Sequence, residues 1–141
     1  IQKSKLVQKI QNYFGQNLTG KTIAIWGLAF KPETDDIREA SSIVTIKGLL
    51  DAGATLKVYD PAAMDNIRAI FGDKLIYASN QNEALEGADA LGIVTEWKQF
   101  KEASLDEIKA ILKEAVIFDG RNIYHHKEMK EASFYYESIG R

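Results

Sequence analysis

Two loops of the sequence carry cations of the kind that bind phosphate. Lys31 and Arg38 lie within residues 27–39, and Arg121 follows an Asp-Gly pair typical of a turn. Hydrogen bonds from such cations to phosphate oxygens are worth roughly 1.5–3 kcal/mol each. The planar fork of Arg121 also suits a sugar diol. A fold that brings the two loops together would therefore form a site for a phosphorylated ligand.

Each cation of the first loop also has an ordinary structural interpretation. Lys31 could be solvated, and Arg38 could pair with Asp35 or Asp36. We expect the two aspartates to cap the following helix rather than to hold a metal ion, because Asp is favoured at helix starts. The residues alone leave phosphate binding and local pairing equally open for Lys31 and Arg38.

The later loops allow similar alternatives. Arg121 could form a salt bridge with Asp119 instead of contacting a ligand. Trp97 could stack on a base, although we expect it to anchor the segment that follows it. His125 and His126 are the two histidines of the chain, and we expect them at the exposed start of a helix. A metal cluster or a catalytic triad built on histidine is therefore not expected.

The elements that would position these loops alternate between strand and helix. Apolar runs typical of buried strands and stretches of helical periodicity follow one another along the chain. Strands are predicted at 22–27, 55–59, 74–77, 88–94, 115–118 and 134–136, and helices at 1–14, 43–50, 62–71, 81–86 and 105–112. This alternation predicts an α/β fold with a doubly wound, mostly parallel, Rossmann-like sheet of about six strands in the order 3-2-1-4-5-6.

Ligands of such sheets bind beyond the carboxyl ends of the strands, where the strand order reverses. That rule selects residues 27–39, 94–100 and 119–124, which include the cations described above. The first loop lacks the glycine fingerprint of dinucleotide sites, because no glycine occurs between Gly27 and Gly48. We therefore expect side chains, rather than a cradle of backbone amides, to hold the phosphates.

Composition narrows the classes of function. The 141 residues are 45% hydrophobic and 27% charged, with a net charge of -2, so neither nucleic acid nor an anionic membrane is expected as a partner. No apolar run approaches the roughly 18 residues of a membrane-spanning helix. The chain has no cysteine, which excludes disulfides, thiolate metal sites and a cysteine nucleophile within it. A cytoplasmic setting fits this composition.

The first residues are expected to form a separate element. Leu6, Ile10, Tyr13 and Phe14 have the spacing of one helix face, and Gly15 suits a helix end. We divide the chain into residues 1–17, a helix with its linker, and residues 18–141, the compact domain. The apolar stripe has no obvious partner in the sequence, so we expect the helix to dock on something else. A non-catalytic dimerisation or regulatory module is therefore an alternative function.

A receiver-type signalling domain has a similar size and architecture. It would need an acceptor aspartate at the end of the third strand and a lysine at the end of the fifth. Here the third strand ends at Tyr77-Ala78, and the fifth leads into Asp119-Gly120-Arg121. The sequence does not favour this class.

Several motifs resemble one family of enzymes. Residues 27–40, GLAFKPETDDIREA, closely resemble the motif that opens the C-terminal domain of the UDP-glucose/GDP-mannose dehydrogenases. Four shorter segments agree in order and spacing: VYDP at 58–61, TEW at 95–97, DGRN at 119–122 and SIGR at 138–141. The resemblance covers about residues 3–141, and the first 14 residues resemble the end of the central helical region of the family. Ala40 and Ser42 stand where Ser and Pro are frequent.

The resemblance implies a UDP-sugar-binding domain that is inactive alone. Enzymes of this family have an N-terminal NAD-binding domain and a helical middle region used in dimerisation. They oxidise UDP-glucose to UDP-glucuronate in two steps with two NAD, through a thioester on a cysteine of the middle region. The full enzyme is then expected to be a homodimer or a higher homo-oligomer. NAD would bind mainly to the other domain, which accounts for the missing glycine fingerprint.

The resemblance also assigns roles to individual residues. Phe30, Lys31 and Arg121 match substrate contacts, and Arg38 matches a contact to NAD from across the cleft. No catalytic residue and no metal ligand is expected in this chain. Relatives act on UDP-N-acetylmannosamine or GDP-mannose, and these sugars remain alternatives to UDP-glucose.

Overall fold

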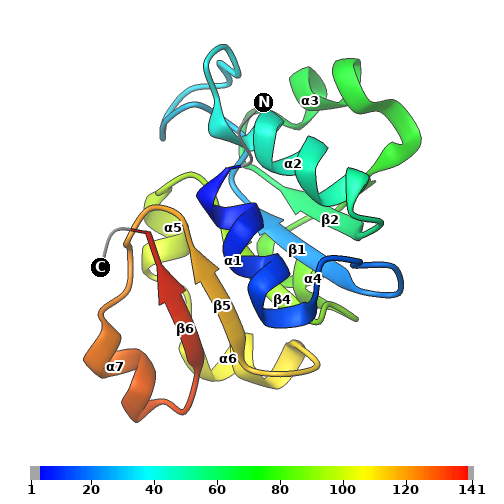
Figure 1. Cartoon of the computed structure of the whole chain (residues 1–141). Helices are drawn as coiled ribbons and strands as arrows, with labels where there is room; N and C mark the ends of the chain where they lie inside the picture. The colour runs from blue at the N-terminus through cyan, green and yellow to red at the C-terminus, as the bar shows by residue number, and fades with distance from the viewer. Residues whose placement is uncertain (1–3, 140–141) are drawn as a thin grey trace.

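The structure is a computed structural model that describes residues 4–139. Six parallel strands form one sheet in the order β3-β2-β1-β4-β5-β6 (Figure 1). The strands are β1 Thr22–Trp26, β2 Thr55–Tyr59, β3 Ile76–Tyr77, β4 Ala90–Ile93, β5 Val116–Asp119 and β6 Tyr135–Ser138. The α/β class and the strand order that the sequence predicts are confirmed.

The described part of the chain has seven α-helices and one short 3-10 helix; α1 precedes β1, and the others connect the strands. The helices are α1 Lys5–Phe14, α2 Ser41–Asp51, α3 Met64–Phe71, α4 Gln81–Leu85, α5 Lys98–Lys101, α6 Leu105–Ile111 and α7 His126–Glu131, and the 3-10 helix is Gly72–Lys74. The sequence does not predict α5, which has only four residues and too few positions for a periodic pattern. His125 and His126 do lie at the start of a helix, as expected.

The strand β1 lies at the centre of the sheet. It pairs with β2 along its whole length, from Thr22 with Thr55 to Trp26 with Tyr59, and with β4 on its other side. The chain leaves β1 toward β2 and returns through β4 on the opposite side. The strand order therefore reverses between β1 and β4, and the carboxyl ends of these two strands are the switch point at which such sheets bind ligands.

Alternate residues of the strands face two separate cores. Ile23 and Ile25 of β1 pack in one buried cluster with apolar residues of α1, α2 and α3. Ala24 and Trp26 pack in the other with residues of α4, α5, α6 and α7. Figure 1 shows α1 and α2 in front of the sheet and α4 and α6 behind it. Both faces are covered, and the central strand β4 is apolar and buried along its whole length, as in other parallel sheets.

The first helix packs on this chain's own sheet. Leu6, Val7 and Ile10 are buried in the same cluster as β1, and a Cβ added at Gly48 of α2 would lie 3.0 Å from Val7 Cγ2. The expectation that this helix docks on something else is therefore wrong, because its apolar stripe already has a partner. Residues 1–3 of the predicted helix lie outside the described residues, and the division at residue 17 stays a prediction.

Among the described residues, no helix is both long enough and apolar enough to cross a membrane.

Candidate functional site

Three loops meet at the carboxyl edge of the sheet. They follow β1, β4 and β5, and they are the same three that the sequence selects. The loop after β1 approaches the loop after β4 very closely at Gly27, where a Cβ would lie 2.4 Å from the backbone nitrogen of Thr95. Gly27 has a φ of 100°, a conformation that glycine adopts without strain. Both the close approach to Thr95 and the positive φ therefore require glycine at position 27.

The first three residues after Gly27 have no free backbone group. The nitrogens of Leu28 and Ala29 donate to the Asp60 carboxylate, at 2.7 and 3.0 Å. Their carbonyl oxygens accept from two buried hydroxyls, Ser42 Oγ and Thr95 Oγ1, each at 2.6 Å. Ser42 is one of the two departures from the family motif. The hydrogen bond from its hydroxyl to the Leu28 carbonyl supports the loop directly.

Phe30 completes this set and stands next to the second predicted contact. Its nitrogen donates to the Asp36 carbonyl at 2.8 Å, and its carbonyl accepts from Arg121 at 3.2 Å. Its ring is 38% exposed, and Lys31 Nζ lies 5.8 Å from the ring centroid. Within residues 4–139, Lys31 makes no hydrogen bond or salt bridge, so its ammonium group is solvated and available.

Arg121 links all three loops. Its Nε donates to the Val94 carbonyl at 2.8 Å and its Nη2 to the Phe30 carbonyl at 3.2 Å. Its Nη1 lies 3.7 Å from Glu96 Oε1, a buried oxygen with no hydrogen bond among the described residues. The two backbone bonds use two of the five guanidinium N–H groups. Of the remaining three, those on Nη1 face Glu96, and the partly exposed side chain can still donate to a ligand at this edge of the sheet.

Asp119 does not pair with the Arg121 guanidinium, so that alternative is wrong. Its carboxylate is fully buried and accepts from three backbone nitrogens and from the Tyr136 hydroxyl. The donors include the Arg121 nitrogen at 2.9 Å and the Tyr136 hydroxyl at 2.6 Å. These bonds shape the turn from which the arginine side chain projects. Burial and the neighbouring Asp119 charge raise the pKa of Tyr124, which lies on the same turn.

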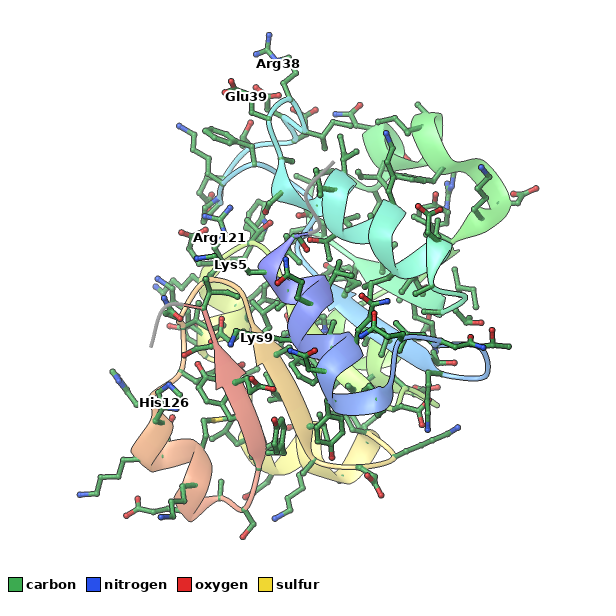
Figure 2. All side chains as sticks on the ribbon, in the orientation of Figure 1. Lys5, Lys9, Arg38, Glu39, Arg121 and His126 are labelled. Atoms are coloured by element: carbon green, nitrogen blue, oxygen red, sulfur yellow. The ribbon has the colours of Figure 1, made fainter. Side chains whose placement is uncertain are left out.

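Arg38 stands on the outer part of the first loop. Figure 2 shows it at the tip of the loop, pointing away from Arg121. It pairs with Asp36, whose Oδ2 lies 2.8 Å from Nη2, and its side chain is 87% exposed. The hydrogen bond from Arg38 lowers the pKa of Asp36 to about 2 and raises that of the guanidinium. Of the alternatives for Arg38, this structure shows the pairing with Asp36.

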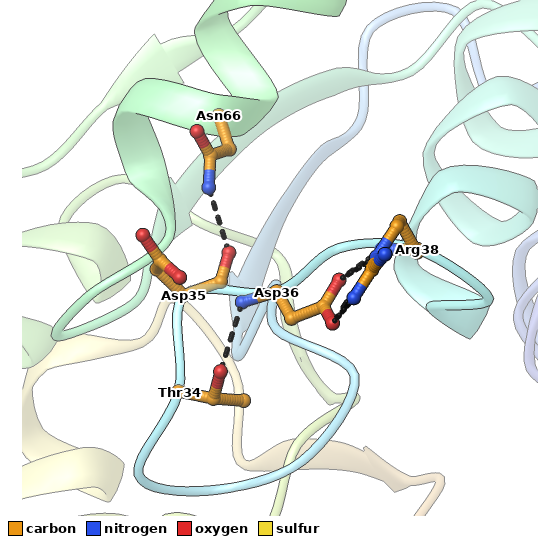
Figure 3. A network of polar contacts seen from close by, with 5 residues as sticks. All are labelled: Thr34, Asp35, Asp36, Arg38 and Asn66. Carbon is orange, nitrogen blue, oxygen red and sulfur yellow. Dashed lines mark hydrogen bonds and ion pairs between the residues drawn. The ribbon is translucent and has the colours of Figure 1, made fainter.

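Hydrogen bonds hold the outer part of the loop in shape, and Figure 3 shows those between Asn66 and Asp35, between Asp36 and Thr34, and between the Arg38 guanidinium and the Asp36 carboxylate. Asn66 of α3 donates to the Asp35 carbonyl at 2.8 Å, the Asp36 nitrogen donates to Thr34 Oγ1, and the Arg38 nitrogen donates to Asp36 Oδ1 at 2.9 Å. Neither aspartate caps α2, whose N-cap is Ala40 without a side-chain cap. That expectation is wrong, because the loop runs on for several residues before the helix begins.

The four residues singled out by sequence thus gather at one edge of the sheet. Arg121 contacts Phe30, Lys31 lies beside the Phe30 ring, and Phe30 and Arg38 line one hollow of about 330 Å³. Among the described residues, no group of three or more acidic or histidine side chains is placed to hold a metal ion. The arrangement presents two cations and an aromatic ring on a fixed backbone, which suits a phosphorylated ligand with a ring to stack.

Asp60 is the residue of this site that the sequence interpretation missed. It is 1% exposed, and its carboxylate accepts from Leu28, Ala29, Ala62, Ala63 and the Trp97 indole. Trp97 is itself buried, so it anchors the segment after β4, as expected, and does not present its ring to a base. An acidic residue directly after a buried strand, followed by proline, is the signal that could have identified Asp60.

Fold and site together define a Rossmann-like domain with cationic and aromatic side chains at the switch point of its sheet. Residues 24–126 match the family model for the UDP binding domain of the UDP-glucose/GDP-mannose dehydrogenase family. The chain belongs to this family.

Known proteins that are similar to this chain include UDP-glucose dehydrogenases. The chain is 39% identical to the UDP-glucose 6-dehydrogenase of Pseudomonas aeruginosa, over 99% of this chain and 32% of that protein. It is 41% identical to UDP-glucose 6-dehydrogenase TuaD of Bacillus subtilis, over 99% of this chain and 30% of that protein. The solved structure of a UDP-glucose dehydrogenase from Pyrobaculum islandicum matches with a TM-score of 0.76 at 32% identity, over 94% of this chain and 28% of that one. The chain thus spans about a third of the length of the relatives that it matches.

Proposed function

We propose that this chain is the domain that binds the UDP-sugar in an NAD-dependent dehydrogenase that oxidises UDP-glucose to UDP-glucuronate in two steps. The observation that carries the proposal is the gathering of Phe30, Lys31 and Arg121 at the switch point of the sheet. The names of the relatives support UDP-glucose as the sugar. The catalytic cysteine would lie elsewhere in such an enzyme, because this chain has none.

The residues divide the work of binding. Arg121, held by two carbonyls, directs its remaining N–H groups at diphosphate oxygens, and charge-assisted bonds of this kind are the strong ones. Lys31 adds a second, mobile cation beside them. The exposed ring of Phe30 offers a face to the base or the ribose. A rigid donor and a rigid ring fix the orientation of the nucleotide, while the sugar extends toward the missing part of the enzyme.

The first loop does not fit the pyrophosphate of NAD. The amides after β1, which hold it in dinucleotide domains, already donate to Asp60. NAD would therefore bind mainly to another domain and supply the hydride acceptor from there. Arg38, solvent-exposed at the tip of the loop, is the residue of this chain that we assign to NAD from across the cleft. It would exchange Asp36 for a cofactor phosphate.

Titration calorimetry with UDP, UDP-glucose and GDP tests the proposal. UDP and UDP-glucose should bind the 141-residue chain, and GDP should bind at least about tenfold more weakly. Arg121→Met and Lys31→Met should each weaken UDP binding by about tenfold, the loss of one charge-assisted contact. Lys74→Met removes an exposed cation at the start of β3, the opposite edge of the sheet, and should leave binding unchanged.

Equal affinities for UDP and GDP would contradict the choice of nucleotide. Unchanged UDP binding by both the Arg121 and Lys31 variants would refute the assigned roles. A dimerisation or regulatory module is not favoured, because the apolar stripe that suggested it packs on the sheet. The full enzyme is still proposed to be a homodimer or higher oligomer, as in the family, and to act in the cytoplasm.

A further inference from the structure

Asp60 is the most heavily bonded carboxylate at the site. Both oxygens are used: Oδ1 accepts from the nitrogens of Ala62 and Ala63 at 2.8 and 2.9 Å, and Oδ2 from Leu28, Ala29 and the Trp97 indole. The donors come from three segments, after β1, β2 and β4. A buried carboxylate is costly to desolvate, and five donors offset that cost.

Asp60 accepts two hydrogen bonds from the segment that carries the proposed ligand contacts, from the nitrogens of Leu28 and Ala29. With them, every backbone N–H and C=O of residues 28–30 has a partner within the chain. Lys31 is the next residue. The directions in which the Phe30 ring and the Lys31 ammonium leave the backbone therefore depend on an anion that is itself out of reach of solvent.

The N–H groups around the Asp60 carboxylate form an anion cradle, a set of donors that converge on one negative group. Backbone amides after the first strand of a doubly wound sheet point at a common position and bind phosphate in dinucleotide domains. Here the two amides after β1 and the Trp97 indole N–H donate to Oδ2 of a carboxylate from the end of β2, and its Oδ1 accepts from two amides of its own segment. The charge is supplied by the protein, so the ligand's phosphates must be bound elsewhere, by side chains.

We propose that Asp60 is an internal anion that fills the phosphate cradle after β1 and thereby positions Phe30 and Lys31 for the nucleotide-sugar. It is a positioning residue, since its oxygens are buried and reach no ligand. It also determines specificity, because a filled cradle cannot accept the pyrophosphate of a dinucleotide. The part that concerns the nucleotide-sugar rests on the proposed function, whereas the filled cradle does not.

Chemical rescue tests the cradle in the 141-residue chain. Asp60→Ala removes a group of the size and charge of formate and leaves five donors unpaired. We expect its Tm to fall by about 10 °C and to recover by at least half in formate, but not in chloride of equal ionic strength. If the variant folds only in formate, that is the same positive result. Asp60→Asn keeps the space filled, and formate should not change its Tm.

Asp89→Ala is the matched control. Asp89 Oδ2 accepts from one backbone nitrogen, that of Thr22, at 2.8 Å on the opposite edge of the sheet. Its Tm should not respond to formate. Formate responses of equal size in the Asp60 and Asp89 variants, or none in Asp60→Ala, would overturn the cradle.

Amide hydrogen exchange tests the positioning without any nucleotide. The amides of Leu28, Ala29 and Phe30 should exchange at least about tenfold faster in Asp60→Ala, and formate should restore their protection. UDP affinity should fall about tenfold and recover with formate in the same way. If the wild-type chain fails to bind UDP, the proposed function fails while exchange still decides the positioning. Unchanged exchange at all three amides would refute it.

Discussion

The loop after β1 has two halves that the protein holds in opposite ways. Residues 27–30 are tied to four other segments of the chain, and every backbone group of 28–30 is bonded. Residues 31–39 are exposed or half-buried, and their hydrogen bonds among the described residues are made within the loop, with the adjoining Ala40, or with Asn66 of α3. Each half has an arginine nearby: Arg121 beside the inner half, Arg38 on the outer.

The difference shows how binding can be divided between order and mobility. Arg121 makes two hydrogen bonds to carbonyls of other loops, so its ordering is already complete before a ligand arrives. Arg38 has one local partner, which a ligand anion can replace at small cost. A fixed contact suits the substrate that must be oriented. A replaceable one suits a group that arrives from another domain.

The largest effect is expected where the inner half meets the loop after β4. Gly27→Ala would place a Cβ 2.4 Å from the Thr95 nitrogen at a φ of 100°. Strain and displacement together should lower the free energy of unfolding by about 3 kcal/mol, measured by urea denaturation. Gly15→Ala is the control, because Gly15 has a similar φ of 108° with nothing near its Cβ. Gly15→Ala should lower the free energy of unfolding by about 1 kcal/mol. Equal losses in the two variants would show that the contact with Thr95 does not explain the effect at Gly27.

The sheet could be predicted from sequence because its signals are local. Short apolar runs bounded by turn residues mark most of the strands, and the handedness of the crossovers then restricts the order. The motif around Lys31 and the Asp-Gly turn before Arg121 also place the candidate site in loops that the structure brings together at the carboxyl edge of the sheet. These signals can be recognised in the sequence without knowledge of the folded structure.

The partners within the site could not be predicted, because they come from distant parts of the chain. Asp60 and Asp119 look like ordinary turn residues in the sequence, yet each is a buried acceptor for several donors. The sequence allows Arg121 to pair with Asp119. In the structure the Asp119 carboxylate instead accepts hydrogen bonds from backbone N–H groups and from a tyrosine hydroxyl. The partner of α1 was missed for the same reason. Its stripe meets a surface formed only when the sheet assembles.

A pair of conservative substitutions should separate the two arginines. Lysine keeps the charge but has no planar fork, so Arg121→Lys cannot reach both the Val94 and the Phe30 carbonyl. We expect a loss of about 1–2 kcal/mol in the free energy of unfolding. Arg38→Lys, on an exposed side chain, should leave the free energy of unfolding essentially unchanged. Urea denaturation of both variants measures this, and equal changes would contradict the contrast between the halves.

The smallest effect concerns the charge pair of the outer half. The Arg38 hydrogen bond lowers the pKa of Asp36 from 3.8 to about 2. Because the folded-state pKa is the lower one, the pair contributes to stability above pH 3.8, and the contribution is lost as the pH falls toward 2. Carboxyl NMR titration should place the midpoint of Asp36 near 2, and in Arg38→Gln it should move back toward 3.8. Lys31→Gln, which removes only a weaker electrostatic contribution, should move it much less. A midpoint that stays near 2 without the Arg38 guanidinium would mean that the loop backbone, and not the replaceable partner, holds Asp36 ionised, and the outer half would then be as preorganised as the inner one.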